Sequence, residues 1–389
     1  MKKQIIIICG ALMLVFSFCR HGYDYSSDKL SAFYNLAPKA SKKIMYDKIN
    51  IEKVALDSVA SSYLGSISYR NDTMFFVDYR FNWVYLFNKD GKKIKRLLGQ
   101  GRGPAEIPAG IIQAHVPLLN GGHFFIGVSY DIYQYGNNFS KLYSNRLAWS
   151  HEYTTKQEIL KNPYPDRMLV YDINNEIYYK PRIFDDNVYL PIYSACPSFN
   201  FLSDNYYEYG RIMAQVELKT GKIKKIMGRR SPEYKKQKYL VFDFYSFDIS
   251  AKSNFYINFP PDSLIYVYDE NFKPIKTFGL AGKNMDTKYR KLQNGNNRKE
   301  LWQSEIENKG YYTWIEYFDG QDLLFRSYTK GKHSQTDGLQ IYKSNVLVAD
   351  VDVPKKFRIE GYIAPYFYSN CFIDEENEKM WVYKFELDL

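Results

Sequence analysis

Apolar and polar residues alternate in short runs from about residue 45 to the end of the chain, with turn-forming residues between the runs. The clearest unit is an alternating run, a tight turn, a second run rich in Lys or Arg, and a glycine. Three good copies occupy residues 84–99, 213–228 and 265–279, and two weaker ones occupy 132–142 and 339–348. Alternation with a period of two turns one face of a strand toward a core, and Asp-Gly or Asn-rich turns join strands into hairpins. The pattern therefore predicts an all-β fold of repeated hairpins.

A single hairpin cannot bury its apolar face, so repeated hairpins must stack against one another. A repeat spacing of about 45 to 85 residues suits the four-stranded antiparallel blades of a six-bladed β-propeller. The chain divides into six units, at about residues 60–103, 111–149, 172–230, 241–280, 311–353 and 357–389. The sixth unit is one strand short, and we predict that residues 50–56 supply the missing strand and close the ring. A β-sandwich is the alternative fold for the same short strands.

Two stretches interrupt the repeat, at about residues 150–175 and 284–310. The first reads as a mixed loop, and the second is polar and basic with a predicted helix around residues 298–307. Long irregular connections in a compact fold are often functional, but loops also tolerate insertions at little cost. Both readings, a ligand-shaping element and a neutral insertion, stay open for each stretch.

The N-terminus indicates export. Positive residues at 1–3 precede an apolar run at 5–18, which is too short to span a bilayer as a helix but fits the hydrophobic region of a signal peptide. The run ends at Cys19 and polar residues follow, a layout that resembles a bacterial lipoprotein signal in which the Cys is lipidated. Phe18 stands where such signals usually carry a small residue, so secretion without lipid and an uncleaved anchor are the alternatives.

These features predict three parts: a lipoprotein signal peptide at 1–19, a flexible tether at 20–44 and a single propeller domain at 45–389. The predicted location is the bacterial envelope, with the protein lipid-anchored in the outer membrane on its periplasmic or surface face.

Composition agrees with a globular β protein, because the chain is 45% hydrophobic and 25% charged and contains 38 Tyr and 26 Phe. The formal net charge is +10. The basic runs at 92–96 and 222–225 fall on strands predicted to face outward, so we interpret them as solvated surface and expect no nucleic-acid partner. Cys196 and Cys371 remain in the folded part, and we expect two free thiols rather than a disulfide.

No motif in the chain specifies a cofactor, a metal site or catalytic residues. The glycines at 99–103 lack the ending of a phosphate loop, and we interpret the segment as a tight crossing between blades with Arg102 and Glu106 available to pair. The histidines of the folded part are isolated in sequence: His115, His123, His151 and His333. The acidic pairs that could hold a calcium ion, without any EF-hand loop, are Asp185 with Asp186 and Asp350 with Asp352.

The segment at 98–106, Leu-Gly-Gln-Gly-Arg-Gly-Pro-Ala-Glu, resembles the Gly-Arg-Gly-Pro-Gly-Glu segment of uncharacterised six-bladed propeller lipoproteins of Bacteroidetes, and residues 261–268 are similar to them too. Ala105 replaces a glycine of that pattern. The resemblance implies an envelope propeller of unknown ligand, and it implies no catalytic residues.

These observations favour a monomeric binding or scaffold protein whose partner is an envelope glycan, a peptide or a protein. The alternative is a hydrolase or lyase in which acidic residues and His from different blades meet at the central channel. A third reading is a structural partner in a membrane complex. Convergent acidic residues and His at the channel would favour the enzyme, whereas a stripe of exposed Tyr and Trp would favour sugar or peptide binding.

Overall fold

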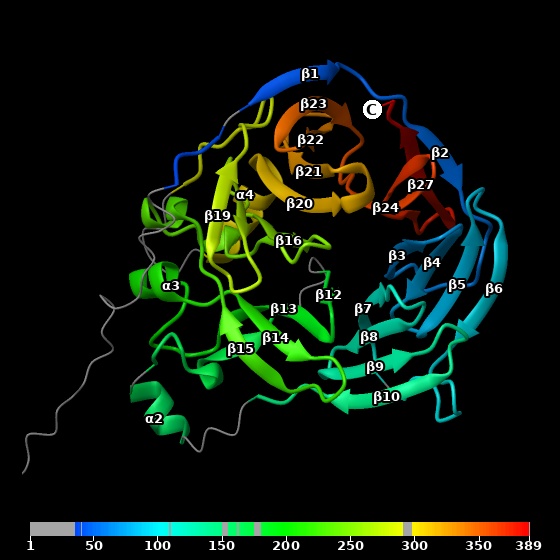
Figure 1. Cartoon of the computed structure of the whole chain (residues 1–389), viewed down its shortest axis with the longest axis horizontal. Coiled ribbons are helices and arrows are strands. Elements are labelled where there is room, and N and C mark those ends of the chain that lie inside the picture. The colour runs from blue at the N-terminus through cyan, green and yellow to red at the C-terminus, as the bar shows by residue number, and fades with distance from the viewer. Residues whose placement is uncertain are drawn as a thin grey trace, which may run out of the picture.

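The computed structural model describes residues 36–39, 41–108, 110–149, 155–161, 163–174, 180–290 and 298–388. Within these residues six sheets stand around a common centre, each with its first strand near the centre and its last strand at the rim (Figure 1). This is the predicted six-bladed propeller of four-stranded antiparallel blades, and the β-sandwich alternative is wrong.

Each blade is an antiparallel meander that runs outward from the centre. Blade 1 consists of β3 (Gly65–Arg70), β4 (Thr73–Asp78), β5 (Trp83–Asn88) and β6 (Lys93–Leu98). Blade 2 consists of β7 (Ile112–Pro117), β8 (His123–Gly127), β9 (Asp131–Tyr135) and β10 (Lys141–Arg146). Blade 3 consists of β11 (Tyr171–Ile173), β12 (Arg182–Phe184), β13 (Asn187–Ser194), β14 (Met213–Glu217) and β15 (Ile223–Met227).

The remaining three blades follow the same order. Blade 4 consists of β16 (Ser246–Ile249), β17 (Phe255–Asn258), β18 (Ile265–Tyr268) and β19 (Pro274–Phe278). Blade 5 consists of β20 (Tyr311–Phe318), β21 (Leu323–Thr329), β22 (Asp337–Lys343) and β23 (Val346–Val353), with β1 (Lys42–Tyr46) outside them. Blade 6 consists of β24 (Ile359–Ile363), β25 (Tyr366–Ser369), β26 (Phe372–Asp374) and β27 (Lys379–Glu386), with β2 (Glu52–Ala55) outside them.

The ring closes through β2, as predicted from the alternation of residues 50–56. Strand β2 pairs antiparallel with β27, so the last blade is made from both ends of the chain. The side chain of Val54 lies opposite Val382 and is buried with it between blades 6 and 1. Closure in this manner covers the outer edge of β27 and ties the two ends of the chain into one blade.

Backbone pairing begins before residue 44, the predicted boundary between tether and propeller. Strand β1 pairs in parallel with β23 along the outer edge of blade 5, and Lys39 forms a β-bridge with Phe278 of blade 4. An outermost strand exposes most of its side chains, and β1 has the exposed sequence Lys-Lys-Ile-Met-Tyr. Its polar character therefore resembles that of a linker even though the backbone is paired.

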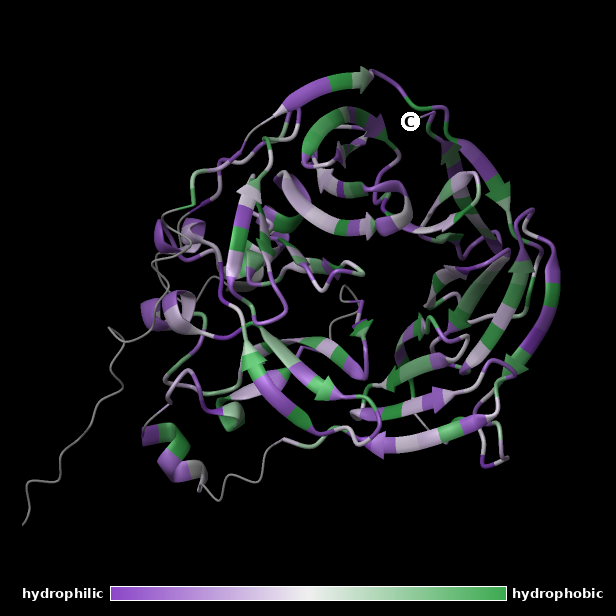
Figure 2. Ribbon diagram, in the orientation of Figure 1, coloured by the Kyte–Doolittle hydropathy of each residue, from purple (hydrophilic) through white to green (hydrophobic). Residues whose placement is uncertain are grey.

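The core lies between neighbouring blades because each inner strand is buried on both faces. In β4, Met74 and Phe76 pack in the core shared with blade 6, while Phe75 and Val77 pack in the core shared with blade 2. Hydrophobic residues accordingly concentrate in the middle strands and polar ones along the rim (Figure 2). The aromatic excess of the composition fills these seams between blades.

One face of the ring carries the connections from each outermost strand to the next innermost strand. We call it the crossover face. In an antiparallel meander the turn between the second and third strands lies at the same edge, so Tyr79, directly after β4, also lies on this face. The long insertions fall among these connections. They carry the following described helices: α2 (Lys156–Lys161), α3 (Asp204–Tyr209), α4 (Arg298–Asn308), and the short 3-10 turns Met168–Val170, Pro232–Lys235 and Leu240–Phe242. A further 3-10 turn, Asp319–Gln321, joins β20 to β21.

Helix α4 confirms the helix predicted around residues 298–307. It packs against the 3-10 turn Leu240–Phe242, so the insertion covers the flank of blade 4. In Figure 1 the helices gather beside blades 3 and 4, and blades 1, 2 and 6 carry none of the labelled helices.

Candidate functional site

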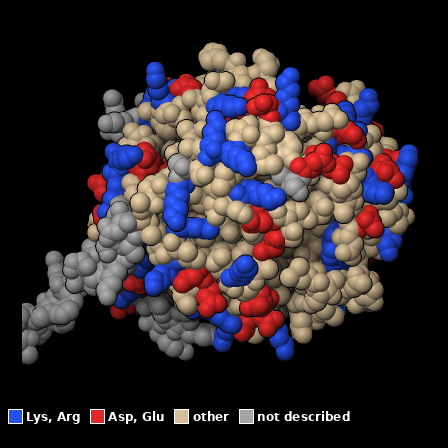
Figure 3. Space-filling view, turned by 45° about the horizontal axis from the view of Figure 1, so that its top comes forward, with Lys and Arg blue, Asp and Glu red and all other residues tan. Residues whose placement is uncertain are grey.

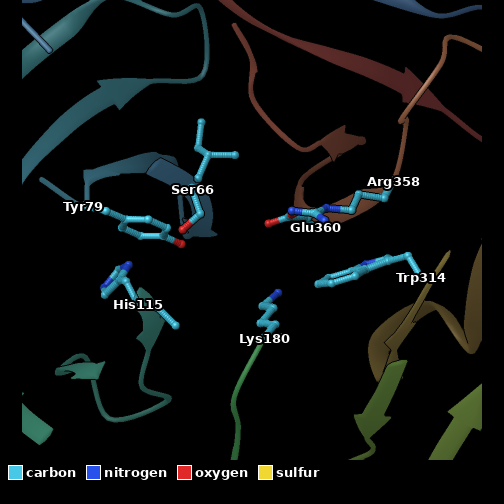
Figure 4. A pocket seen from close by; sticks show the side chains of 9 residues that line it. Ser66, Tyr79, His115, Lys180, Trp314, Arg358 and Glu360 are labelled. Atoms are coloured by element: carbon cyan, nitrogen blue, oxygen red, sulfur yellow. The ribbon is translucent and has the colours of Figure 1, made fainter. Parts of the chain in front are cut away.

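The innermost strands converge on a polar hollow in the central channel. The hollow holds about 340 Å³ of space between atoms, with the open solvent at its mouth included. It is a small site, with room for about two water molecules. Five blades contribute its lining, which consists of Ser66, Ile67, Tyr79, Ala114, His115, Lys180, Trp314, Arg358 and Glu360 (Figure 4).

Trp314 of β20 organises the side of the hollow formed by blades 5 and 6. Its indole Nε1 donates a hydrogen bond to the carbonyl of Ile359 at 2.8 Å, which fixes the ring across the seam between these blades. The guanidinium of Arg358 lies over the ring at 4.5 Å from its centroid, a favourable cation–π distance. Arg358 Nε donates to Glu360 Oε1 at 2.6 Å. The arginine is thus held in place by a ring and by a carboxylate from its own strand.

A buried ion cluster lies beside the hollow, where blades 3, 4 and 5 meet. Arg182 of β12 forms a bidentate pair with Glu316, with nitrogen–oxygen distances of 2.9 and 2.6 Å, and lies 3.2 Å from Asp248 Oδ1. It also donates to the backbone carbonyls of Phe247 and Ile315, so every nitrogen of the guanidinium is engaged. The cluster therefore fastens three blades together at the axis.

Lys180 joins the cluster to the hollow. Its Nζ lies 2.9 Å from Glu316 Oε1 and 5.9 Å from the centroid of Trp314. Desolvation raises the pKa of Asp248 to about 6, against the opposing attraction of Arg182. The pKa of Glu316 is lowered, because the attraction of Arg182 and Lys180 outweighs its burial. Asp248 is therefore the carboxylate of the cluster that protonates first on acidification.

The structure corrects the reading of His115 and His123 as isolated residues. They lie diagonally across strands β7 and β8, with His115 Nε2 3.0 Å from His123 Nδ1. Arg70 approaches His123 Nε2 at 3.1 Å, and Ser68 Oγ lies 2.9 Å from His115 Nδ1. Arginine only donates, so His123 accepts at Nε2 and donates from Nδ1, and His115 accepts at Nε2 and donates to Ser68.

Both imidazoles are neutral in this chain of hydrogen bonds. Burial lowers the pKa of His115 well below its usual range, and the nearby His123 adds to the effect. Burial and the charge of Arg70 lower the pKa of His123 to about 3. Phe139 stacks on His123 and Phe125 on His115, which supplies the apolar surroundings. The pair fastens blade 1 to blade 2 and presents no basic nitrogen to the hollow.

The glycine–arginine segment is structural, as predicted, but its expected ion pair does not form. Glu106 turns back and accepts a hydrogen bond from the amide of Gly103 at 2.7 Å. A Cβ at Gly101 would lie 1.9 Å from Glu106 Oε2, so only glycine leaves room for that carboxylate. Arg102 is exposed and makes no ion pair with the described residues.

The remaining sequence candidates do not come together. Asp350 accepts hydrogen bonds from Tyr328 and Gln340, and Asp352 pairs with Lys330. Among the residues that the structure describes, no three His, Cys, Asp or Glu side chains form a group that could hold a metal ion. His333 lies in the connection between β21 and β22, away from the histidine pair, and His151 falls outside the described residues.

The two basic runs lie on outermost strands, as predicted. Residues 92–96 run along β6 and residues 222–225 along β15, at the rim of the ring. Lys and Arg side chains are spread over the face shown in Figure 3, with Asp and Glu among them. On this face the positive charge is spread over the surface and interspersed with acidic residues.

Cys196 and Cys371 are free thiols that belong to different core clusters, in agreement with the expectation that they do not pair. The predicted lipidation residue, Cys19, falls outside the described residues. In the described part of the chain, none of the helices has the length and apolar character needed to cross a membrane.

The sequence analysis missed the residues that line the hollow. One signal was available. Charged side chains recur two residues apart where the innermost strands begin, as Lys180 with Arg182 before and in β12, and Arg358 with Glu360 before and in β24. On a strand, positions two apart share a face, so such pairs in an otherwise apolar repeat indicate a face turned to the channel. No local motif indicates that these faces meet, because they come from blades far apart in sequence.

Comparisons with known proteins give the fold. No protein-family model matches the sequence, and no curated protein matches it. A member of the DUF4221 family from Bacteroides vulgatus is similar in structure, with a TM-score of 0.61 at 13% identity over 87% of this chain and 98% of that one. A protein from Bacteroides fragilis that is classed as exported has a TM-score of 0.50 at 16% identity, over 90% of this chain and 98% of its own. This chain therefore shares a six-bladed propeller fold with proteins of Bacteroides, in agreement with the predicted resemblance.

Proposed function

We propose that the protein is an exported propeller, lipid-anchored in the bacterial envelope through Cys19, which binds a small polar ligand at the hollow of its central channel. The observation that carries the binding role is the hollow itself, where polar side chains from five blades converge with room for a ligand group. Only the closed ring brings these residues together, so the site is a property of the whole propeller.

The anchoring role rests on the N-terminal sequence. The positive start, the apolar run at 5–18 and Cys19 form the pattern of a lipoprotein signal. The described chain enters the propeller at its rim, where Lys39 bridges to blade 4. A lipid attached upstream of that point leaves the central channel accessible to a ligand.

Binding agrees with the site better than hydrolysis or elimination does, although acidic residues and a histidine do converge at the channel. A general base needs a free lone pair of its own that points at the proton it removes. Asp248 has a raised pKa, yet Oδ1 accepts from the amide of Ile249 and Oδ2 from that of Tyr317, both at 2.8 Å. Both ring nitrogens of His115 are engaged, Nε2 by His123 and Nδ1 by Ser68. The hollow has no exposed aromatic stripe among its described lining residues, because Tyr79 and Trp314 are both buried and the ring of Trp314 already carries Arg358.

One experiment tests the anchor and another tests the hollow. The wild type and Cys19→Ala are expressed in a Bacteroides host and compared by intact mass and detergent partitioning, and only the wild type is expected to carry acyl chains and enter the detergent phase. Equal, unmodified behaviour of the two would refute the anchor.

The binding role is tested on the Cys19→Ala protein with a panel of sugars, sugar acids, amino acids and dipeptides. Thermal unfolding reports binding, because a ligand that binds only the folded state raises the midpoint. The matched variant Ser66→Leu fills the hollow with an apolar side chain and removes no charge. A probe that stabilises the parent and not Ser66→Leu supports the proposal. If every probe that binds stabilises the parent and Ser66→Leu equally, the hollow is not the binding site.

A further inference from the structure

The hollow offers more hydrogen-bond donors than acceptors. Arg358 donates to Glu360 through Nε, and its two terminal nitrogens have no acceptor among the described residues. Lys180 Nζ has one acceptor, Glu316, and so retains two of its three donor hydrogens. Both side chains keep contact with solvent, with 30% of Arg358 and 17% of Lys180 exposed. A site with unengaged cationic donors selects a ligand that brings negatively charged acceptors.

Arg358 and Lys180 have donors without an acceptor, whereas Arg182, the third cation of the channel, has none. Arg182 lies in the same channel, but all of its nitrogens are occupied by Glu316, Asp248 and two backbone carbonyls. Its side chain is only 9% exposed. Arg182 therefore has a structural role, while Arg358 and Lys180 are held beside the hollow with donors to spare.

The two available cations are already positioned. Trp314 is fixed by its hydrogen bond to Ile359, and its ring lies under Arg358 and near Lys180. Figure 4 shows Lys180 and Arg358 on two sides of the same hollow, with Glu360 beside the arginine. Ordering these side chains in advance reduces the entropy that a ligand would otherwise lose on binding.

Glu360 limits the ligand further. It is 4% exposed in its side chain and uses Oε1 for Arg358, and its second oxygen has no hydrogen-bond donor among the described residues. A ligand with one negative charge next to a hydroxyl suits this arrangement, because the hydroxyl donates to Glu360 while the anion binds the cations.

We propose that the hollow binds the carboxylate of a sugar acid between Lys180 and Arg358, with a neighbouring hydroxyl of the sugar donating to Glu360. This inference rests on the proposed binding function and names its ligand class. A planar carboxylate matches the two terminal nitrogens of a guanidinium in a way that a neutral hydroxyl does not. The small hollow has room for the carboxylate group, and the sugar ring would remain outside it. A saccharide suits this lining better than a peptide with an apolar side chain, because Lys180, Arg358 and Glu360 offer charged hydrogen-bonding groups.

The test measures the affinity of the soluble Cys19→Ala protein for D-glucuronate, D-glucose, L-glutamate and inorganic phosphate by calorimetry. We expect glucuronate to bind and glucose to bind at least about tenfold more weakly, the discrimination typical of a charged hydrogen bond. Arg358→Gln keeps a donor for Glu360 and removes the charge, and Lys180→Met removes the second cation. Each should weaken glucuronate about tenfold or more. Lys95→Met, on the exposed outer strand β6, is the control for charge and should change nothing.

The outcomes separate the two proposals. Equal affinity for glucose and glucuronate, lost in Ser66→Leu but retained in Arg358→Gln and Lys180→Met, would overturn the sugar-acid inference and leave the binding function standing. Tighter binding of phosphate or glutamate than of glucuronate would also overturn the inference. If no probe is sensitive to Ser66→Leu, both proposals fail. Because Lys180→Met also removes a partner of Glu316, near-ultraviolet circular dichroism checks that the fold is intact, and the more exposed Arg358→Gln gives the decisive comparison.

Discussion

Replacing Arg182 by Met should be among the most destabilising single changes at the centre of the ring. The guanidinium is the main partner of Glu316 and Asp248, whose side chains are 8% and 9% exposed. Methionine retains the length of the side chain and leaves two carboxylates in the interior with only Lys180 nearby. Removing one partner of a buried ion pair costs about 3–5 kcal/mol, since the remaining charge is desolvated without compensation.

The expected shift in melting temperature follows from the size of the propeller. With an unfolding entropy of about 2.1 cal/mol/K per residue and about 340 folded residues, a loss of 3–5 kcal/mol lowers the midpoint by about 4–7 °C. Arg146→Met is the matched control, because Arg146 is 68% exposed and pairs with Asp131 at the rim. A surface ion pair contributes about 0–1 kcal/mol, so this control should change the midpoint by about 1 °C or less.

The loss should also depend on pH. Without Arg182 the pKa values of Asp248 and Glu316 rise in the folded state, above those of the unfolded chain. A group with a raised folded-state pKa stabilises the protein below its unfolded pKa, and that contribution is lost as pH rises through the folded-state value. The difference between wild type and Arg182→Met should therefore narrow on acidification from pH 7 to pH 5. Adding Asp248→Asn should recover much of the loss at pH 7, since Lys180 still pairs with Glu316.

The assay is chemical and thermal unfolding followed by tryptophan fluorescence at both pH values. If the free energy of unfolding falls by less than about 1 kcal/mol at pH 7, the reasoning is contradicted, because a loss of that size is expected for an exposed ion pair. A loss that is equal at pH 5 and pH 7 would show that packing, and not the buried charges, sets the cost.

Three further predictions follow from the same contacts. Asp248→Asn alone should become more stable relative to wild type as pH rises from about 4 to about 7. Burial raises the pKa of Asp248 to about 6, so wild type loses stability as this carboxyl ionises and the variant does not. Thermal unfolding across this pH range checks the sign. Val54→Asp on β2 should destabilise the protein by about 3 kcal/mol by placing a carboxylate opposite buried Val382. Limited proteolysis should then cut near residues 56–64, whereas the control Glu52→Gln, at the exposed first residue of β2, should not have this effect. Gly361→Ala should lower the free energy of unfolding by about 1–3 kcal/mol, because a Cβ there would lie 2.2 Å from the ring of Tyr69 at the seam between blades 1 and 6. Denaturant unfolding measures this loss.

The propeller could be predicted from the sequence because the signal for each blade lies within a short segment and recurs along the chain. Each hairpin combines a period of two with a turn, and β2 could be assigned to the last blade because residues 50–56 alternate and the sixth unit lacks a strand. Strand β1 was missed because an exposed outermost strand needs no apolar alternation. Its place is set by the free backbone edge of β23, which no residue of β1 reveals.

The site was missed for a different reason. Lys180, Trp314 and Arg358 come from blades 3, 5 and 6, and only the closure of the ring brings them to one hollow. The pairing of His115 with His123 depends on the register of β7 with β8, and the sequence does not fix that register to one residue. Contacts within a hairpin could be predicted, and contacts across the axis could not.

Polar side chains along the axis are themselves a consequence of the architecture. An innermost strand has one backbone edge without a strand partner, so its amides and carbonyls need polar groups, as Arg182 supplies to Phe247 and Ile315. A charged channel is therefore expected in a propeller with or without a ligand, and the informative feature is which donors remain unengaged. Arg182 and Arg358 lie in the same channel but differ in this feature and in burial, with 9% and 30% of their side chains exposed. Arg182→Met should therefore change stability, and Arg358→Gln should change binding with little effect on stability. If Arg182→Met changed binding and Arg358→Gln changed stability, the structural role of Arg182 and the binding role of Arg358 would both be wrong.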